Sequence, residues 1–203
     1  MKNVAVLIFD DVEVLDFCGP FEVFSVAGRR SDLKPFNVYT VAESAGPVIA
    51  RNNLSVNPAH TFSDCPEPDI LLVPGGYGTR KEMDNPVLID WVKRCAAKSE
   101  LVLSVCTGAL ILAKAGLLDG LAATTHHGAM QLLKEVAPRT EVLPSERIVD
   151  NGRIVLSAGI SAGIDMSLYV VGRLLGEAQA KETAAYMEYD WSERIKARRY
   201  NAL

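Results

Sequence analysis

Cys106 is the residue whose surroundings in the sequence point most directly to chemistry. It follows the apolar run Leu101–Val105 and precedes Thr107-Gly108, where a helical pattern begins. A sharp strand-to-helix turn of this kind presents a side chain at the top of a sheet, as in the nucleophile elbow of hydrolases. The N-terminus of the helix favours negative charge on the sulfur, so we expect a lowered pKa and a thiolate nucleophile. The alternative is a small buried residue that merely fits a tight turn.

A glycine-rich turn follows a second apolar run, Ile70–Val73. Its sequence is Pro74-Gly75-Gly76-Tyr77-Gly78. The backbone amides of Gly75 and Gly76 could point into a cleft beside the sulfur and stabilise a developing negative charge. The glycines lack the spacing of dinucleotide-binding and phosphate-binding loops, so no nucleotide cofactor is predicted.

Asp16 is a carboxylate among apolar neighbours, ahead of a helix expected over residues 21–27. It can be interpreted as a helix cap, which is worth about 1 kcal/mol. It can equally face Cys106, in which case the apolar setting should raise its pKa and hold a proton for general-acid catalysis. The spacing alone does not choose between these two interpretations.

Two histidines, His126 and His127, follow a strand-like segment at residues 122–125. Adjacent residues of a strand face opposite ways, so at most one of the two should reach a given site, where it could orient a substrate or act as a base. The chain has three histidines and no clustered carboxylates. We therefore expect no metal site.

Apolar runs of strand length alternate with amphipathic helical patterns along the chain. Strands are expected at residues 4–9, 36–42, 70–73, 101–105 and 122–125, and helices at 21–27, 85–99, 108–115, 129–136, 163–175 and 178–189. Hairpins are expected around Asn52-Asn53 and around Asn151-Gly152, the second with a type I′ turn. The pattern predicts an α/β fold with a doubly wound, mostly parallel sheet, helices on both faces and a small side hairpin. Ligands of such folds bind at the carboxyl ends of the strands.

The composition excludes several classes of function. The 203 residues carry a formal charge of −4, which gives no basic footprint for nucleic acid. The first apolar run is too short for a signal peptide and is interrupted by Asp10-Asp11, and no other run approaches the ~20 apolar residues of a membrane span. The four cysteines form no C-x-x-C pair. We expect a soluble cytoplasmic protein with reduced thiols that binds neither nucleic acid nor membrane.

Six stretches in one order resemble the ThiJ/PfpI superfamily, and the likeness spans nearly the whole chain. They are residues 15–20, 73–76, 104–108, 115–120, 123–126 and 159–165. The resemblance implies a flavodoxin-like fold, a single domain over residues 1–203, a homodimer and no cofactor. Within the superfamily the motifs are most similar to those of the isocyanide hydratase branch. That branch implies a small-molecule substrate and the addition of water to R–N≡C, giving an N-substituted formamide.

The resemblance also implies roles for individual residues. Cys106 would be the nucleophile, Asp16 its acid/base partner, and Thr107 would hydrogen-bond toward Asp16. Gly75 and Gly76 would line the anion-stabilising side.

Three further residues are expected to form an apolar pocket for an uncharged substrate. They are Phe17, Tyr77 and Ile160. In the resulting path, the thiolate attacks the terminal carbon, a proton from Asp16 gives a thioimidate, and water then displaces the thiol.

Departures from other branches of the superfamily narrow the choice. A peptidase-like branch has histidine where this chain has Thr107. A glyoxalase and deglycase branch has glutamate at the position of Asp16, although His126 stands where that branch carries its histidine. Chemistry on α-oxoaldehydes is therefore one alternative, and a non-catalytic redox sensor or stress protein that oxidises at Cys106 is another.

A further relative is the ligand-sensing domain of AraC-type regulators, which continues into a helix-turn-helix domain that we do not find here. The last basic residues are expected to be a solvated helix end rather than a DNA-binding element. They are Arg194, Lys196, Arg198 and Arg199.

Overall fold

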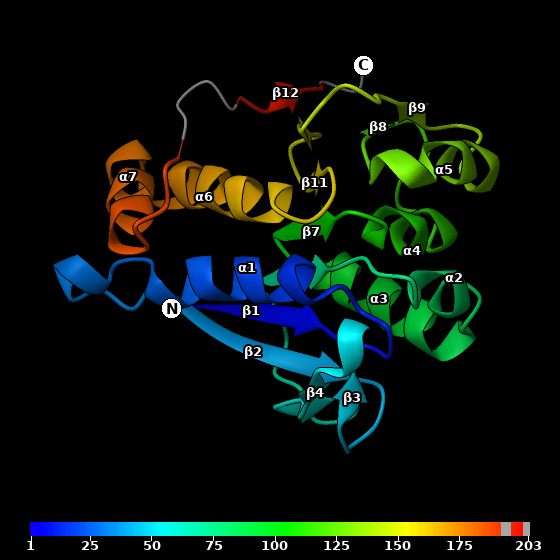
Figure 1. Cartoon of the computed structure of the whole chain (residues 1–203), viewed down its shortest axis with the longest axis horizontal. Coiled ribbons are helices and arrows are strands. Elements are labelled where there is room, and N and C mark those ends of the chain that lie inside the picture. The colour runs from blue at the N-terminus through cyan, green and yellow to red at the C-terminus, as the bar shows by residue number, and fades with distance from the viewer. Residues whose placement is uncertain (192–195, 201–203) are drawn as a thin grey trace.

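The computed structural model of the chain describes residues 1–191 and 196–200, and an eight-stranded sheet forms its centre (Figure 1). The strands are, in spatial order, β12 (Arg198–Arg199), β10 (Ile148–Asp150), β11 (Ile154–Ser157), β7 (Leu101–Val105), β6 (Ile70–Val73), β1 (Lys2–Leu7), β2 (Phe36–Ala42) and β5 (His60–Thr61). All neighbours pair in parallel except β10 and β11, which are antiparallel. The predicted mostly parallel sheet is confirmed.

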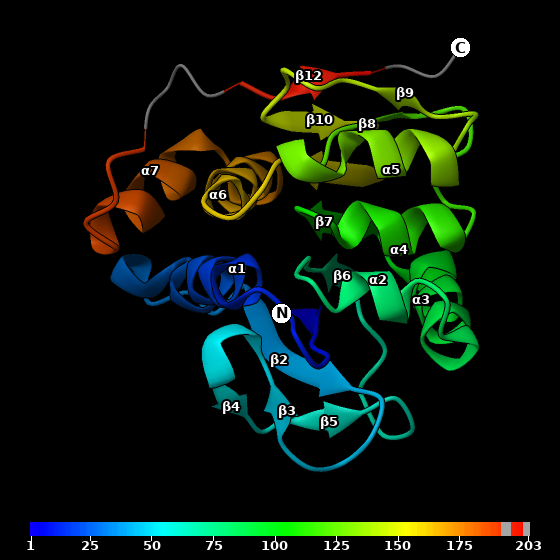
Figure 2. The ribbon, with the colours of Figure 1, turned by 45° about the vertical axis from the view of Figure 1, so that its right-hand side comes forward.

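Helices cover both faces of this sheet, as predicted. Figure 2 shows one group on the left, which consists of α1 (Val14–Val26), α6 (Ala162–Leu175) and α7 (Glu177–Tyr186). The other group, on the right, consists of α2 (Thr79–Glu82), α3 (Pro86–Lys98), α4 (Gly108–Lys114) and α5 (Met130–Val136). The central strands β6 and β7 are fully buried between the two groups, which explains why they read as continuous apolar runs.

Two small sheets flank the main one. The strands β3 (Val48–Ile49) and β4 (Ser55–Val56) form the predicted side hairpin, and Asn52 and Asn53 between them both have positive φ. The strands β8 (Ala122–Ala123) and β9 (Glu141–Val142) pair in parallel as a separate sheet. The expected strand at 122–125 is therefore shorter than predicted and does not join the central sheet.

The first helix begins earlier than the sequence predicts. We expected a helix over 21–27 with Pro20 near its start, whereas α1 begins at Val14 and contains Pro20 in its interior. Proline removes one backbone hydrogen bond and is unfavourable there. Burial of α1 residues such as Phe17 and Val23 against the core and α6 outweighs this penalty. Asp16 consequently lies in the first turn of the helix and is not its cap.

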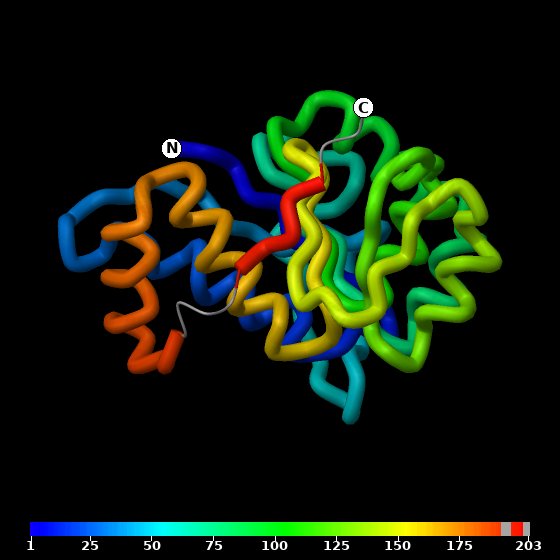
Figure 3. Tube along the Cα trace, turned by 90° about the horizontal axis from the view of Figure 1, so that it is seen from above, coloured from blue at the N-terminus to red at the C-terminus, as the bar shows by residue number. Residues whose placement is uncertain are grey.

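The C-terminal part departs from prediction at two points. The turn at Asn151-Gly152 is not type I′, because only Gly152 has positive φ, while the Asn151 side chain hydrogen-bonds to both backbone groups of Ala122. Arg198 and Arg199 form the edge strand β12 along β10 instead of a helix end, as the red segment of Figure 3 shows. Arg194 lies outside the described residues. No helix in the described part of the chain is long and apolar enough to cross a membrane.

Candidate active site

Cys106 stands at the end of β7 in a strained backbone conformation. Its φ is +57°, in the left-handed region that non-glycine residues rarely adopt. Two contacts hold it there: its N–H donates to the Ser157 carbonyl at 3.2 Å, and the Thr125 hydroxyl donates to its carbonyl at 2.7 Å. Such a conformation is unfavourable by about 1–2 kcal/mol and is concentrated at functional sites. The predicted elbow is therefore present.

Gly108 allows the helix after the elbow to approach the sheet. A Cβ atom at this position would lie 2.1 Å from the carbonyl oxygen of Val73 in the neighbouring strand β6. No side chain fits in that space, so α4 can start directly behind Cys106 only with glycine here. The close approach expected from the sequence is confirmed.

Asp16 faces Cys106 from the first turn of α1, across the C-terminal edge of the sheet. It is fully buried, and the Gly75 N–H donates to its Oδ2 at 3.1 Å. Its Oδ1 has no hydrogen-bond partner of regular geometry among the described residues, and its carboxyl group interacts directly with the Cys106 side chain. Burial raises the pKa of Asp16 to about 7, and the contacts with Cys106 and Gly75 offset only part of that rise. The structure thus favours the proton-carrier interpretation over the helix cap.

The Cys106 thiol is not acidified in the way the sequence suggests. Burial, followed by the negative charge of Asp16, raises its pKa to about 12. The backbone N–H and the hydroxyl of Thr107 act in the opposite direction and have the smaller effect. The expected lowering of the pKa is therefore wrong for the resting site, in which the sulfur keeps its proton. Because the two groups are coupled, a proton can pass between them.

Thr107 and Gly76 are joined by two hydrogen bonds, and Gly75 is hydrogen-bonded to Asp16. The Gly76 N–H donates to the Thr107 Oγ1 at 3.0 Å, and that hydroxyl lies 3.0 Å from the Gly76 carbonyl, to which it donates. Thr107 therefore does not make the expected hydrogen bond toward Asp16. The Gly75 N–H already donates a hydrogen bond to the Asp16 carboxylate. Neither glycine amide is free to receive charge that develops beside the sulfur, and their contribution is to fix Asp16 and Thr107.

A cleft of about 200 Å³ opens onto Cys106. Its lining residues are Glu13, Arg51, Gly76, Tyr77, Arg80, Cys106, Thr107, His126 and Ile160. The structure thus brings together most of the residues that the sequence singled out. Asp16 and Gly75 lie behind the lining. Phe17 is absent from the lining because its side chain is buried in the core, so the prediction that it contributes to the pocket is wrong.

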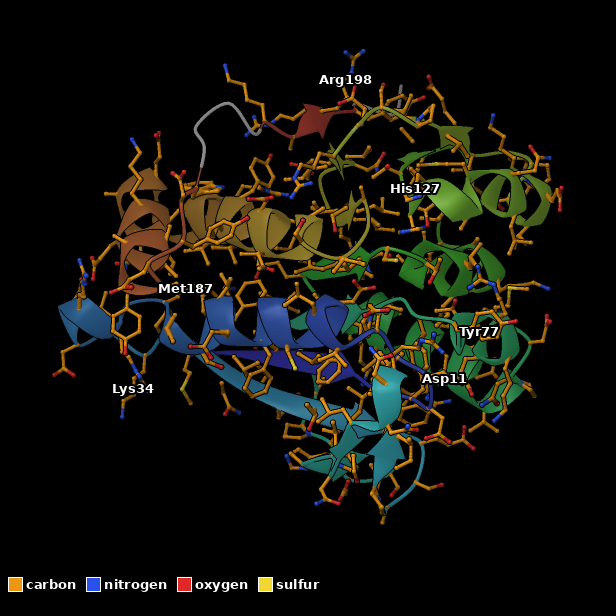
Figure 4. The ribbon with its side chains drawn as sticks, viewed as in Figure 1. Asp11, Lys34, Tyr77, His127, Met187 and Arg198 are labelled. Carbon is orange, nitrogen blue, oxygen red and sulfur yellow. The ribbon has the colours of Figure 1, made fainter. Side chains whose placement is uncertain are left out.

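Sequence reasoning missed the charged residues at this cleft, Glu13, Arg51 and Arg80. The expected pocket was apolar, but only Tyr77 and Ile160 of the predicted residues give it that character. Figure 4 labels Tyr77 and Asp11 near each other in the right half of the view, and Arg51 pairs with Asp11 at 3.2 Å. The position of Arg80, two residues after the glycine-rich turn, was the signal in the sequence that could have identified it.

His126 enters the cleft and His127 does not, although the reason differs from the one predicted. The two rings do not face opposite ways but lie 4.1 Å apart at 35°, because the strand ends at Ala123 and a 3-10 turn, His127–Ala129, follows. Burial, together with His127 and Arg80, lowers the pKa of His126. Its Nδ1 accepts a hydrogen bond from the Gly128 N–H at 3.1 Å, so the neutral ring carries its proton on Nε2.

The described residues contain no group of three or more histidine, cysteine, aspartate or glutamate side chains that could hold a metal ion.

Known proteins with similar sequences or structures include a hydratase, a transcriptional regulator and a ThiJ/PfpI family protein. The isonitrile hydratase of Pseudomonas putida is 35% identical over 188 residues, which cover 92% of this chain and 78% of that protein. The transcriptional regulator CdhR of Pseudomonas aeruginosa is 30% identical over 88% of this chain, which spans only 52% of the regulator. The crystal structure of a ThiJ/PfpI family protein from Pseudomonas syringae superimposes with a TM-score of 0.84 at 30% identity, covering 94% of this chain and 76% of that one.

The model of the DJ-1/PfpI family matches residues 2–173, which include the elbow, the glycine-rich turn, Asp16 and His126. The match agrees with the fold and with the cleft at Cys106. This chain is a member of the DJ-1/PfpI family.

Proposed function

We propose that this protein hydrates a small electrophile, and that its reaction converts an isocyanide to an N-substituted formamide. The observation that carries the proposal is the pairing of a strained, buried cysteine with a carboxyl group whose pKa lies near 7. A group of that pKa is suited to both taking and giving a proton at neutral pH. The 35% identity to an isonitrile hydratase supports the choice of substrate class.

In the first half of the proposed reaction, the carboxylate of Asp16 takes the proton of the Cys106 thiol as the sulfur bonds to the terminal carbon of R–N≡C. The same proton then passes to that carbon. The product is a thioimidate, R–N=CH–S–Cys106, and Asp16 is again ionised. Because Asp16 takes the proton during the attack, Cys106 does not need to be a thiolate at rest, a state that its raised pKa disfavours.

In the second half, water adds to the thioimidate carbon. Asp16 accepts one proton of the water and passes this proton to the nitrogen, giving R–NH–CH(OH)–S–Cys106. The carbon–sulfur bond then breaks, the hydroxyl loses its proton to form the formamide carbonyl, and the sulfur is protonated again. One isocyanide and one water give one formamide, with the thiol and the carboxylate restored. His126 can donate a hydrogen bond to the substrate nitrogen from its Nε2–H, because its Nδ1 already accepts the Gly128 N–H.

A second candidate is chemistry on α-oxoaldehydes, which is favoured by the presence of His126 in the cleft. A carbonyl substrate would form a hemithioacetal with Cys106, and an imidazole beside it can move the proton on the adjacent carbon. A redox sensor would use the same cysteine without turnover.

A paired assay separates these functions. Wild type, Cys106→Ala and Asp16→Asn are each incubated with an alkyl isocyanide and with methylglyoxal. Formamide from wild type, none from Cys106→Ala and little from Asp16→Asn support the proposal. Lactate alone identifies the glyoxalase type, and peroxide-dependent mass gain at Cys106 without turnover identifies the sensor. If wild type and Cys106→Ala are equally inert toward the isocyanide, the hydratase proposal fails.

The family resemblance also leads us to propose a homodimer and a cytoplasmic location. Sedimentation velocity of the purified chain would test the dimer, because a species of one chain mass at micromolar concentration would contradict it.

A further inference from the structure

Two arginines at the mouth of the Cys106 cleft have no role in the hydration just described. The Cζ atoms of Arg51 and Arg80 lie 5.9 Å and 5.1 Å from the ring centroid of Tyr77, and all three residues line the cleft. A guanidinium within about 6 Å of an aromatic ring is attracted to its face. Tyr77, labelled in Figure 4, therefore serves as a platform that holds both cations beside the nucleophile.

The charges of the two arginines are balanced differently. Arg51 forms an ion pair with Asp11, at 3.2 Å. Arg80 is half-buried and forms no ion pair with any residue of 1–191 or 196–200. Its charge reaches into the cleft, where it contributes to the lowered pKa of His126. A half-buried cation held at a cleft without a counter-ion is available to an anionic ligand.

The remaining charged group of the lining, Glu13, does not neutralise Arg80. It lies too far from both arginines for an ion pair, and its charge acts on Asp16 and His126 instead. Two cations and one carboxylate thus line the cleft. An anionic group would be repelled from the side of Glu13 and attracted to the two arginines that Tyr77 holds.

We propose that the physiological substrate carries a carboxylate. Arg80, held against the Tyr77 ring, binds this carboxylate with Arg51 nearby, while the electrophilic carbon of the substrate contacts Cys106. This assignment rests on the proposed function, in which the substrate is an isocyanide, and it makes that substrate an isocyano acid. A planar guanidinium binds carboxylate with two parallel hydrogen bonds, which fixes orientation as well as charge. The cleft of about 200 Å³ restricts the substrate to a small acid.

The first test compares two isocyanides of nearly equal shape, 3-isocyanopropanoate and its methyl ester. We expect wild type to hydrate the acid with the higher kcat/KM. Arg80→Met should reduce the acid-to-ester ratio about tenfold, the loss expected for one partly exposed charged contact. Arg80→Lys, which keeps the charge but not the planar fork, should retain part of the preference. Lys81→Met is the matched control, because Lys81 is the next residue of α2 and does not line the cleft.

The second test needs no hydration. Iodoacetate and iodoacetamide both alkylate a thiol by forming a carbon–sulfur bond and releasing iodide, and they differ mainly in charge. The two rates are measured at Cys106 by peptide mapping in wild type, Arg80→Met, Arg80→Lys and Lys81→Met. We expect the iodoacetate-to-iodoacetamide ratio at Cys106 to fall about tenfold in Arg80→Met and to stay unchanged in Lys81→Met.

The two tests separate the failure of this inference from that of the proposed function. If both the acid and the ester are hydrated, and Arg80→Met changes neither the acid-to-ester ratio nor the alkylation ratio, the carboxylate subsite is overturned and the hydratase proposal is retained. No hydration of either compound, together with an Arg80-dependent preference for iodoacetate, overturns the hydratase and retains the subsite. An equal fall of the iodoacetate-to-iodoacetamide ratio in Arg80→Met and Lys81→Met would mean that only the long-range electrostatic effect of a lost positive charge is measured. That result would also overturn the subsite.

Discussion

Replacing Asp16 by asparagine is expected to stabilise the fold, and to do so more strongly as the pH rises. Asp16 is buried, and its pKa is raised from 3.8 to about 7. Between these values the unfolded chain releases a proton that the folded protein keeps, so the carboxyl group lowers the stability progressively as the pH rises from about 4 to 7. Above pH 7 the folded protein carries a buried charge and the full penalty. Asparagine removes the ionisation and can still accept the Gly75 hydrogen bond.

The magnitude follows from the two pKa values. At about 1.4 kcal/mol per pKa unit, the raised pKa of Asp16 lowers the free energy of unfolding by about 4 kcal/mol at pH 8, and by about 2 kcal/mol at pH 5. For a chain of this size, the corresponding gain in Tm for Asp16→Asn is about 10 °C at pH 8 and about 5 °C at pH 5. The difference between the two pH values is the diagnostic quantity, since it is independent of any change in packing.

Urea unfolding of wild type and Asp16→Asn at both pH values measures this difference. Asp32→Asn is the control, because Asp32 is exposed and asparagine tolerates its positive φ of 53°. A gain that is equal at pH 5 and pH 8 would refute the raised pKa of Asp16. It would also remove the physical basis for Asp16 as the proton carrier.

Three other predictions follow from the same geometry. Gly108→Ala should destabilise the protein by about 3 kcal/mol, as its Cβ would overlap the Val73 carbonyl, and thermal unfolding measures this loss. Arg147→Met should lower the free energy of unfolding in urea by about 2 kcal/mol, because it leaves the fully buried Asp165 without its ion-pair partner. The kcat/KM for isocyanide should rise with pH through an apparent pKa of about 7, which a pH–rate profile of wild type and Asp16→Asn would detect and which the variant should lack.

Matched variants control the first two of these predictions. Gly116→Ala places a Cβ in open space at a φ of +71°, so it should cost only the backbone strain of about 1 kcal/mol. An equal loss for Gly108→Ala would argue against the steric overlap. Adding Asp165→Asn to Arg147→Met removes the unpaired charge and should recover much of the stability; no recovery would show that the loss came from packing.

The sequence was sufficient to locate the elbow because its signal is local. A buried strand is followed at once by Cys106, Thr107 and Gly108, and the backbone conformation required there depends on little else. The sheet was predictable for a similar reason, since its central strands are fully buried and appear as unbroken apolar runs. The same locality allowed the raised pKa of Asp16 to be expected from its apolar neighbours.

Features that depend on tertiary packing were not predictable in this way. The start of α1 was misplaced because Pro20 is a strong local signal that burial of the helix overrides. The acidity of Cys106 was misjudged because the helix N-terminus is visible in the sequence, whereas the burial of the sulfur and its contact with Asp16 are not. Arg51 and Arg80 come from a hairpin and from α2, and only the folded chain places both on Tyr77.

In the proposed reaction, Cys106 bonds to the substrate carbon while Asp16 moves the proton. Rapid acid quenching of wild type during turnover of an isocyanide, followed by peptide mass spectrometry, tests it most directly. We expect an adduct with the mass of one isocyanide on the peptide containing Cys106, which forms and decays at rates compatible with turnover and is absent from Cys106→Ala. Formamide production by Cys106→Ala at the wild-type rate would contradict it.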